Sequence, residues 1–286
     1  MKHPIAILAL IGMMFLSKNT SAQSGEEPGS SGDKESTVSV TPRVDYISRL
    51  HYFGRTDNLK SSALVPTLTI KFGEGFYISS SAVFINNAKR SMDYSVISAG
   101  AGYKFGDESG WAGNIYANKY FYTGQKQVQS AQKADAGLVL SWLDKVIDIN
   151  ASAGVAFSNK ADFFLSGGID HAFRFADEKN VFVIIPSVTA NAGTQNYTYS
   201  YMVKRNILIV PVADEQLTKS ARGFRLLSYE ASVPMVYVRG RFSASLTPGY
   251  VLPQNLVTVA GRPDLSEHAS GLFYCNAGIS FTIGKH

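Results

Sequence analysis

The chain has 286 residues, of which 45% are apolar, 12% aromatic and 17% charged, and its formal net charge is +5. The low charge with high aromatic content excludes a disordered chain and a coiled coil, and a single cysteine excludes a disulfide scaffold. After the first twenty residues no apolar stretch is long enough for a spanning helix, which excludes a helical membrane bundle.

Residues 1–22 have the three-part layout of a secretory signal peptide. Lys2 precedes an apolar run at residues 5–16, and polar residues then lead to a small-residue site that ends at Ala22. We expect cleavage after Ala22, which removes two lysines and no acid and so lowers the formal charge from +5 to +3. Residues 23–36 are rich in Gly, Ser and charge, and they are interpreted as a flexible leader in the periplasm.

From residue 37 onward, apolar and polar residues alternate with the period of a β-strand. In the segment that begins near Ile147, for example, odd-numbered positions are apolar and most even-numbered positions are small or polar. The pattern predicts an all-β chain with a single barrel domain over residues 37–286. Twelve segments have this character, at residues 37–54, 61–72, 75–87, 93–105, 111–122, 132–143, 145–158, 161–175, 179–193, 223–237, 240–253 and 269–284.

The connections between these segments alternate between short and mostly longer ones, as expected of an antiparallel barrel with short periplasmic turns and longer external loops. The longest is residues 193–223, which we interpret as two strands that extend above the membrane. A lid over the barrel mouth, or an extra strand pair that raises the count from twelve to fourteen, are the alternatives.

The chemistry of the two faces favours a membrane barrel over a soluble one. The polar face consists mainly of Ser, Thr, Gly, Asn and Tyr, while most of the charge lies in connections and at strand ends. A soluble barrel needs charged residues along the outside of most strands, whereas a polar lumen inside a lipid-facing apolar wall explains both faces. A closed barrel also leaves no unpaired strand edge in lipid.

With its signal peptide, twelve alternating segments and final amphipathic strand at residues 273–283, the chain resembles the Gram-negative outer-membrane β-barrel proteins. The resemblance is architectural and identifies no subfamily. It implies a closed transmembrane barrel in the bacterial outer membrane, contact with outer-membrane lipid, and insertion by the barrel-assembly machinery, which reads the last strand.

The polar face of each segment, taken as inward, predicts the charged side chains that line the pore. These are Arg43, Asp45, Arg49, Lys71, Lys104, Asp135, Asp148, Asp170, Arg174, Glu230 and Arg241, with His51 beside them. Four of the cations fall at the turn-side ends of their segments, so a basic collar is expected there. The hairpin across residues 158–162 is expected to place Asp148 near Ala172.

The favoured function is a narrow, porin-like channel for passive diffusion of small polar or anionic solutes, because rings of charge set channel selectivity. The alternative is a barrel plugged by inward side chains, which acts as a structural or docking protein through its external loops. A lipid-modifying enzyme that uses His268 and Ser270 is a third and weaker reading, so the chain is not expected to be an enzyme. The sequence holds no metal, cofactor or nucleic-acid motif, and none of these is expected as a ligand.

Overall fold

The computed structural model describes residues 38–56, 60–88, 90–106, 110–122, 132–158, 160–194, 223–256 and 270–284. Within these residues there are eighteen strands. They are β1 Val38–Ile47, β2 His51–Tyr52, β3 Arg55–Thr56, β4 Ser62–Phe72, β5 Phe76–Asn87, β6 Arg90–Gly106, β7 Trp111–Tyr122, β8 Ala134–Trp142, β9 Asp148–Phe157, β10 Ala161–Asp170, β11 Phe173–Ala176, β12 Asn180–Ile184, β13 Ser187–Gly193, β14 Arg225–Ser232, β15 Met235–Arg239, β16 Phe242–Pro253, β17 Leu272–Phe281 and β18 Ile283–Gly284. No helix in this part of the chain is long and apolar enough to cross a membrane.

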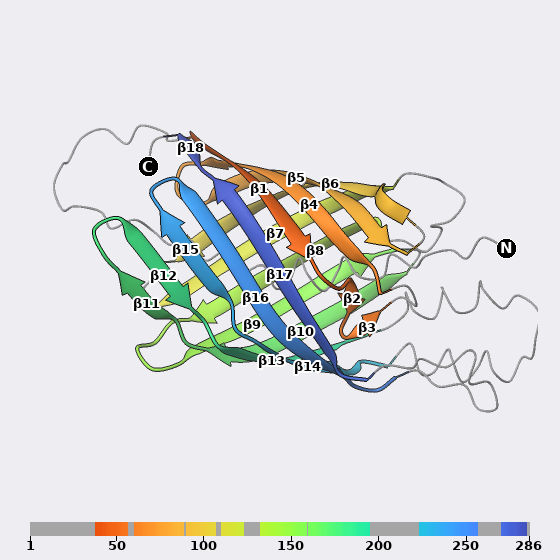
Figure 1. The fold of residues 1–286 in the computed structure, drawn as a ribbon. Coiled ribbons are helices and arrows are strands. Elements are labelled where there is room, and N and C mark those ends of the chain that lie inside the picture. Colours follow the sequence, from red (N-terminus) through yellow and green to blue (C-terminus); the bar gives the residue numbers. More distant parts are fainter. Residues whose placement is uncertain are drawn as a thin grey trace, which may run out of the picture.

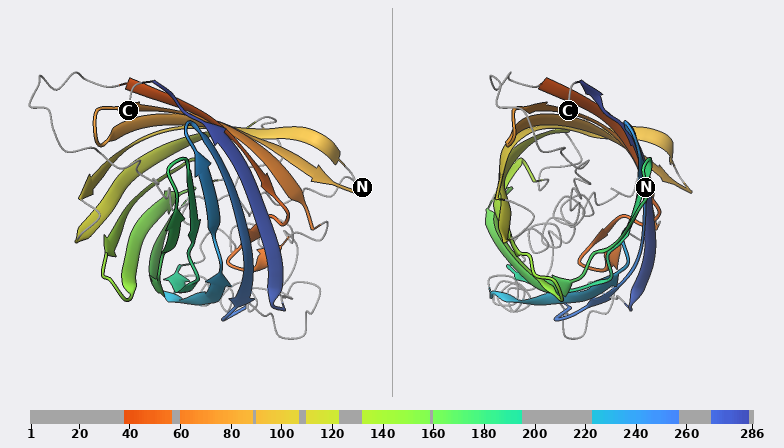
Figure 2. Two further views of the ribbon diagram at one scale, coloured as in Figure 1. Left: turned by 60° about the vertical axis from the view of Figure 1, so that its left-hand side comes forward. Right: turned by 90° about the vertical axis from the view of Figure 1, so that its left-hand side faces the viewer.

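Sixteen of the described strands form one antiparallel sheet that closes on itself, because β17 pairs with both β1 and β16 (Figure 1). Short breaks divide four wall strands into the pairs β10/β11, β12/β13, β14/β15 and β17/β18. The described part of the chain therefore builds the predicted twelve-stranded barrel, seen nearly end-on in Figure 2. Residues 195–222, on which the alternative of fourteen strands depended, lie outside the described residues.

The two ends of the barrel differ in how they connect the strands. At one end, short connections such as residues 73–75 and 240–241 join neighbouring strands. The first strand begins at this end and the last strand finishes at it. Gly73 and Gly240 have φ angles of +58° and +55°, a conformation that glycine adopts without strain in tight turns. We call this the turn end, which lies at the left in Figure 1, and we call the opposite end the loop end.

The outer wall is apolar, with large side chains exposed on every second residue of the wall strands. Along β10, for example, Phe163, Leu165 and Ile169 are all at least half exposed. Aromatic pairs lie near the turn end, where Phe72 packs against Phe76 and Trp111 pairs with Trp142 across β7 and β8. A wide apolar band with aromatic residues near its rim is the surface of a transmembrane barrel.

The sequence prediction of one strand over residues 37–54 is wrong in its second half. Strand β1 ends at Ile47, and the chain then turns into the barrel, where β2 and β3 form a small separate hairpin. The reason lies in residues 50–53, four bulky side chains in a row that are 4%, 2%, 0% and 7% exposed. A wall strand would turn alternate members of this run toward lipid, whereas the inward hairpin buries all four. Phe53 and Gly54 form its tight turn with φ angles of +49° and +82°.

The apolar core of the molecule lies inside the loop-end half of the barrel, around the segment of residues 50–55. Leu50 packs with Val83, Val96 and other side chains of strands β4 to β7. Tyr52 and Phe53 instead pack with side chains of β9, β10 and β14, across the barrel from that first cluster. The segment of residues 50–55 thus reaches from one side of the lumen to the other, and its ribbon lies inside the ring of strands in Figure 2.

Candidate functional site

The barrel encloses a cavity of about 1340 Å³, which is the candidate site. It begins at the turn end, where residues 239–241 contribute to its lining, and it reaches Leu50, His51 and Phe53 of the inward segment. Ser, Thr, Asn and Tyr are the largest group among the described lining residues, and charged side chains add to the polar part of the wall. The cavity is therefore a polar chamber with two limits. The hairpin is its limit toward the loop end, and the short connections are its limit at the turn end.

Eight of the eleven charged residues that the sequence pattern placed in the pore line this cavity. They are Arg43, Asp45, Lys71, Lys104, Asp170, Arg174, Glu230 and Arg241. Four further charged residues in the lining escaped prediction, namely Asp177, Glu178, Lys179 and Arg239. Of the described residues that line the cavity, seven are thus cationic and five anionic.

The remaining three predicted residues lie elsewhere. Arg49 is half-buried just before the inward segment, where its Nη1 donates to the Lys60 carbonyl at 3.2 Å. Asp148 caps the turn before β9, since its Oδ1 accepts the Asp144 backbone N–H at 3.0 Å. Asp135 is only 2% exposed, and its Oδ1 accepts the Tyr120 hydroxyl at 2.6 Å beside the apolar cluster.

Arg43 and Asp45 bind each other on the inner face of β1. The Arg43 Nε lies 2.9 and 2.7 Å from the two Asp45 carboxylate oxygens, and Nη2 lies 2.6 Å from Oδ1. Nη2 also donates to the Ser245 hydroxyl of β16 at 2.9 Å. Because the two charges are paired with each other, they contribute little net potential to the lumen.

Gly278 of β17 lies beneath this ion pair, and a Cβ there would overlap the Asp45 carboxylate. We expect Gly278→Ala to displace the pair and to lower the free energy of unfolding by roughly 1–3 kcal/mol, the usual cost of overpacking. Urea unfolding followed by tryptophan fluorescence measures this. Gly167→Ala is the matched control, because nothing lies within 4 Å of the Cβ position there. Equal unfolding curves for the two variants would contradict the expectation.

Cations gather near the turn end. Lys71 of β4 pairs in register with Tyr77 of β5, and the Lys104 Nζ of β6 lies 5.8 Å from the centroid of the same tyrosine ring. Arg174 of β11 and Arg241, the residue before β16, complete the predicted basic collar, which we define as these four side chains. All four line the cavity near the turn-end limits of their strands, so they face an anion that enters from the turn end.

Two other acidic side chains inside the barrel, Glu230 and Asp170, accept hydrogen bonds from neutral donors. The Tyr274 hydroxyl donates to Glu230 Oε1, and the Asn150 amide donates to Asp170 at 2.8 Å. Asp148 pairs in register with Asp170, and not with Ala172 as the sequence pattern predicted. The expected placement of Asp148 near Ala172 is therefore wrong by two residues, because the connection after β9 is shorter than the sequence pattern indicated.

Two polar side chains position the inward hairpin. The Arg55 guanidinium is buried and donates to the carbonyls of Phe53 and Leu227 at 3.3 Å and of Gln254 at 2.9 Å. The His51 ring lies 5.0 Å from the Tyr274 ring, and its Nδ1 accepts the Gly54 N–H at 3.3 Å. Burial lowers the pKa of His51 from 6.5 to about 4, so this imidazole is neutral at pH 7.

Of the two residues weighed for enzymatic chemistry, the structure describes only Ser270. Ser270 is exposed at the loop end and does not line the cavity, while His268 lies outside the described residues. Among the described residues, no group of three or more His, Cys, Asp or Glu side chains could hold a metal ion.

No protein-family model matches the sequence, and no curated protein matches it. Solved structures of outer-membrane barrels do match it in shape. One is described as KdgM porin, with 11% identity, coverage of 85% of this chain and 98% of that chain, and a TM-score of 0.47. Another is LpxR from Salmonella typhimurium, with 10% identity, coverage of 85% and 99%, and a TM-score of 0.47. The NanC porin has 11% identity, coverage of 85% and 98%, and a TM-score of 0.45. All three TM-scores are below 0.5, so these likenesses carry no argument about what passes through the lumen.

Proposed function

We propose that this chain is a bacterial outer-membrane barrel that passes small polar solutes, with a preference for anions, and that the hairpin β2–β3 controls the passage. The observation that carries the proposal is a polar chamber with cations at its turn end and an inward hairpin at its other limit. Export through cleavage after Ala22, insertion by the barrel-assembly machinery and a periplasmic turn end belong to the same proposal.

The preference for anions follows from the distribution of charge. The Arg43–Asp45 pair cancels itself, and the other charged side chains of the described lining are six cations and four anions. The collar holds four of these cations near the mouth, and Lys179 and Arg239 add two more there, against the two acids Asp177 and Glu178 of the β11–β12 turn. A charged ring at a narrow entrance with low-dielectric walls concentrates ions of opposite sign.

The experiment that tests this function is planar-bilayer recording of the refolded mature protein under a salt gradient. We expect discrete conductance steps with anion preference, and we expect Lys71→Gln with Arg174→Gln to lower the anion-to-cation permeability ratio by roughly threefold. Lys145→Gln is the matched control, because Lys145 is exposed in a turn and does not line the cavity. An unchanged ratio in the double variant, or an equal change in the control, argues against the collar.

The hairpin favours one second candidate, a permanently closed barrel that acts through its external loops. Its aromatic packing across the lumen supports this reading. Silence from demonstrably folded wild-type protein and from variants whose hairpin is loosened would favour the closed barrel over the channel.

A further inference from the structure

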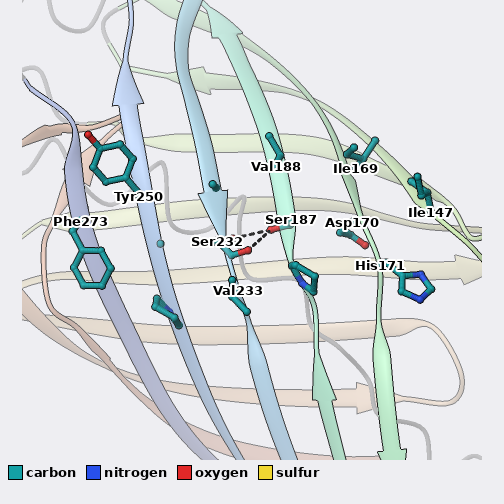
Figure 3. A pocket seen from close by; sticks show the side chains of 14 residues that line it. Ile147, Ile169, Asp170, His171, Ser187, Val188, Ser232, Val233, Tyr250 and Phe273 are labelled. Atoms are coloured by element: carbon teal, nitrogen blue, oxygen red, sulfur yellow. Dashed lines mark hydrogen bonds between the residues drawn. The ribbon is translucent and has the colours of Figure 1, made fainter.

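A shallow groove of about 560 Å³ crosses the outer wall on the side of β10, β13, β14 and β16 (Figure 3). It lies between two rows of outward-facing residues that the strand pairing places in register. The first row is Ile169, Val188, Ala231, Tyr250 and Phe273, and the second is Ile147, His171, Pro186, Val233 and Pro248. The lining is almost wholly apolar.

Small and cyclic side chains create the groove. Ala231 is an exposed methyl side chain between the larger Val188 and Tyr250 in the first row. In the second row, Pro186 and Pro248 stand where long side chains would otherwise project. Asp170, Ser187 and Ser232 line both the groove and the lumen, so a single layer of the sheet separates the two spaces here.

Prolines also weaken the wall beneath the groove. The N–H groups of His171, Ile185 and Val233 donate to the carbonyls of Pro186, Pro234 and Pro248 at 3.4, 2.8 and 3.0 Å. The reciprocal bonds cannot form, because proline has no N–H. Three adjacent strand pairs therefore each lose a ladder bond at this level. On the inner side, the hydroxyls of Ser187 and Ser232 form a hydrogen bond of 2.8 Å.

The two ends of the groove differ in polarity. One end begins at Ile147 and His171, beside the exposed turn residues Asp144 and Lys145. His171 Nδ1 is buried there and has no hydrogen-bond partner among the described residues. The groove then crosses five strand-to-strand steps of about 4.8 Å, roughly 24 Å in all, to Tyr250 and Phe273. Because strands of such barrels tilt by about 35–45°, this path runs obliquely from the turn end into the hydrocarbon band.

We propose that the groove is a binding site for one acyl chain of a phospholipid from the leaflet at the turn end, which covers the thin wall between bilayer and lumen. The headgroup lies beside His171 and Lys145, and the chain runs toward Tyr250 and Phe273. Continuity with the lipid-facing wall identifies the occupant, since the apolar lining disfavours water and hydrocarbon surrounds the groove. The inference rests on the proposed membrane location and not on channel activity.

The test uses full-length mature protein in vesicles that contain phosphatidylethanolamine with a photoreactive diazirine on its acyl chain, near the ester in one probe and at the tail in another. Mass spectrometry of the adducts locates each reaction. We expect labelling at groove residues at least fivefold above that at Ile115, an equally exposed residue on the wall of β7. The ester-side probe should label Ile147 and Ile169, and the tail probe Tyr250 and Phe273.

Ala231→Phe fills the groove and should reduce this labelling to the level of Ile115. Ala153→Phe is the matched control, because Ala153 is an exposed alanine of β9 outside the groove, and it should leave the labelling unchanged. Uniform labelling around the wall overturns the site, and a reversed order of the two probes overturns entry from the turn-end leaflet. A barrel that conducts nothing but gives the expected adducts refutes the channel and leaves the lipid site standing.

Discussion

Replacing both Tyr52 and Phe53 with alanine should raise the single-channel conductance of the refolded barrel several-fold. These two rings anchor the hairpin against Phe164 and Leu227, and removing a buried aromatic side chain costs about 3–5 kcal/mol. The hairpin has no ladder bond to a wall strand in the described structure, so this loss falls on its docking and leaves the strand pairing of the barrel intact. When the hairpin leaves its docked position, the opening between the chamber and the loop end becomes wider.

Planar-bilayer recording measures the change, and heat-modifiable migration on gels verifies that each variant is folded. Phe163→Ala is the matched control, because Phe163 is the sequence neighbour of Phe164 but faces lipid and is 56% exposed. Its conductance should equal that of the wild type. If the double variant folds and conducts no more than the wild type, the hairpin does not limit passage.

Acidification should loosen the same hairpin through His51. Burial holds the folded-state pKa of His51 at about 4, against 6.5 for an exposed imidazole. Between these pH values the imidazole is protonated when the hairpin is undocked and neutral when it is docked. Docking is therefore at full strength above pH 6.5 and weakens as the pH falls toward 4. Since one pKa unit corresponds to about 1.4 kcal/mol, the loss reaches roughly 3 kcal/mol near pH 4.

Conductance recorded between pH 7 and pH 4 tests this, and it should rise across that window in the wild type. The groups that face the imidazole are Tyr274, whose ring lies beside it, and Glu230, which accepts the hydroxyl of that tyrosine. His51→Phe keeps a ring against Tyr274 but cannot be protonated, so its conductance should stay flat over this range. An equal pH response in the variant would assign the titration to another group.

The barrel could be predicted from the sequence because strand alternation is a local signal. In β9 and β17 the two-residue period sets which side chains face lipid, and eight of the eleven charged residues that this rule turned inward line the cavity. It fails at strand ends. Arg49 and Asp148 lie where the chain leaves the sheet, so parity no longer determines their direction.

The hairpin could not be predicted from alternation, because its position depends on contacts with distant strands. Residues 50–53 carried one usable signal, a run of four bulky side chains that breaks the two-residue period just before Gly54. Asp135 shows a different limit. Its inward direction agrees with parity, but Tyr120 from the neighbouring strand covers it, and only the packed structure reveals that cover.

The position of the hairpin in the chain also constrains the order of assembly. Residues 50–55 follow the first wall strand, yet Arg55 binds carbonyls 172 and 199 residues farther along, at Leu227 and Gln254. Those acceptors belong to the last quarter of the polypeptide. The hairpin can therefore dock only after the final strands have joined the sheet, at about the time that β17 pairs with β1 and closes the barrel. On the proposed function, a partly inserted barrel lacks the hairpin that limits passage, and the permeability of the membrane during biogenesis then depends on how quickly closure follows insertion.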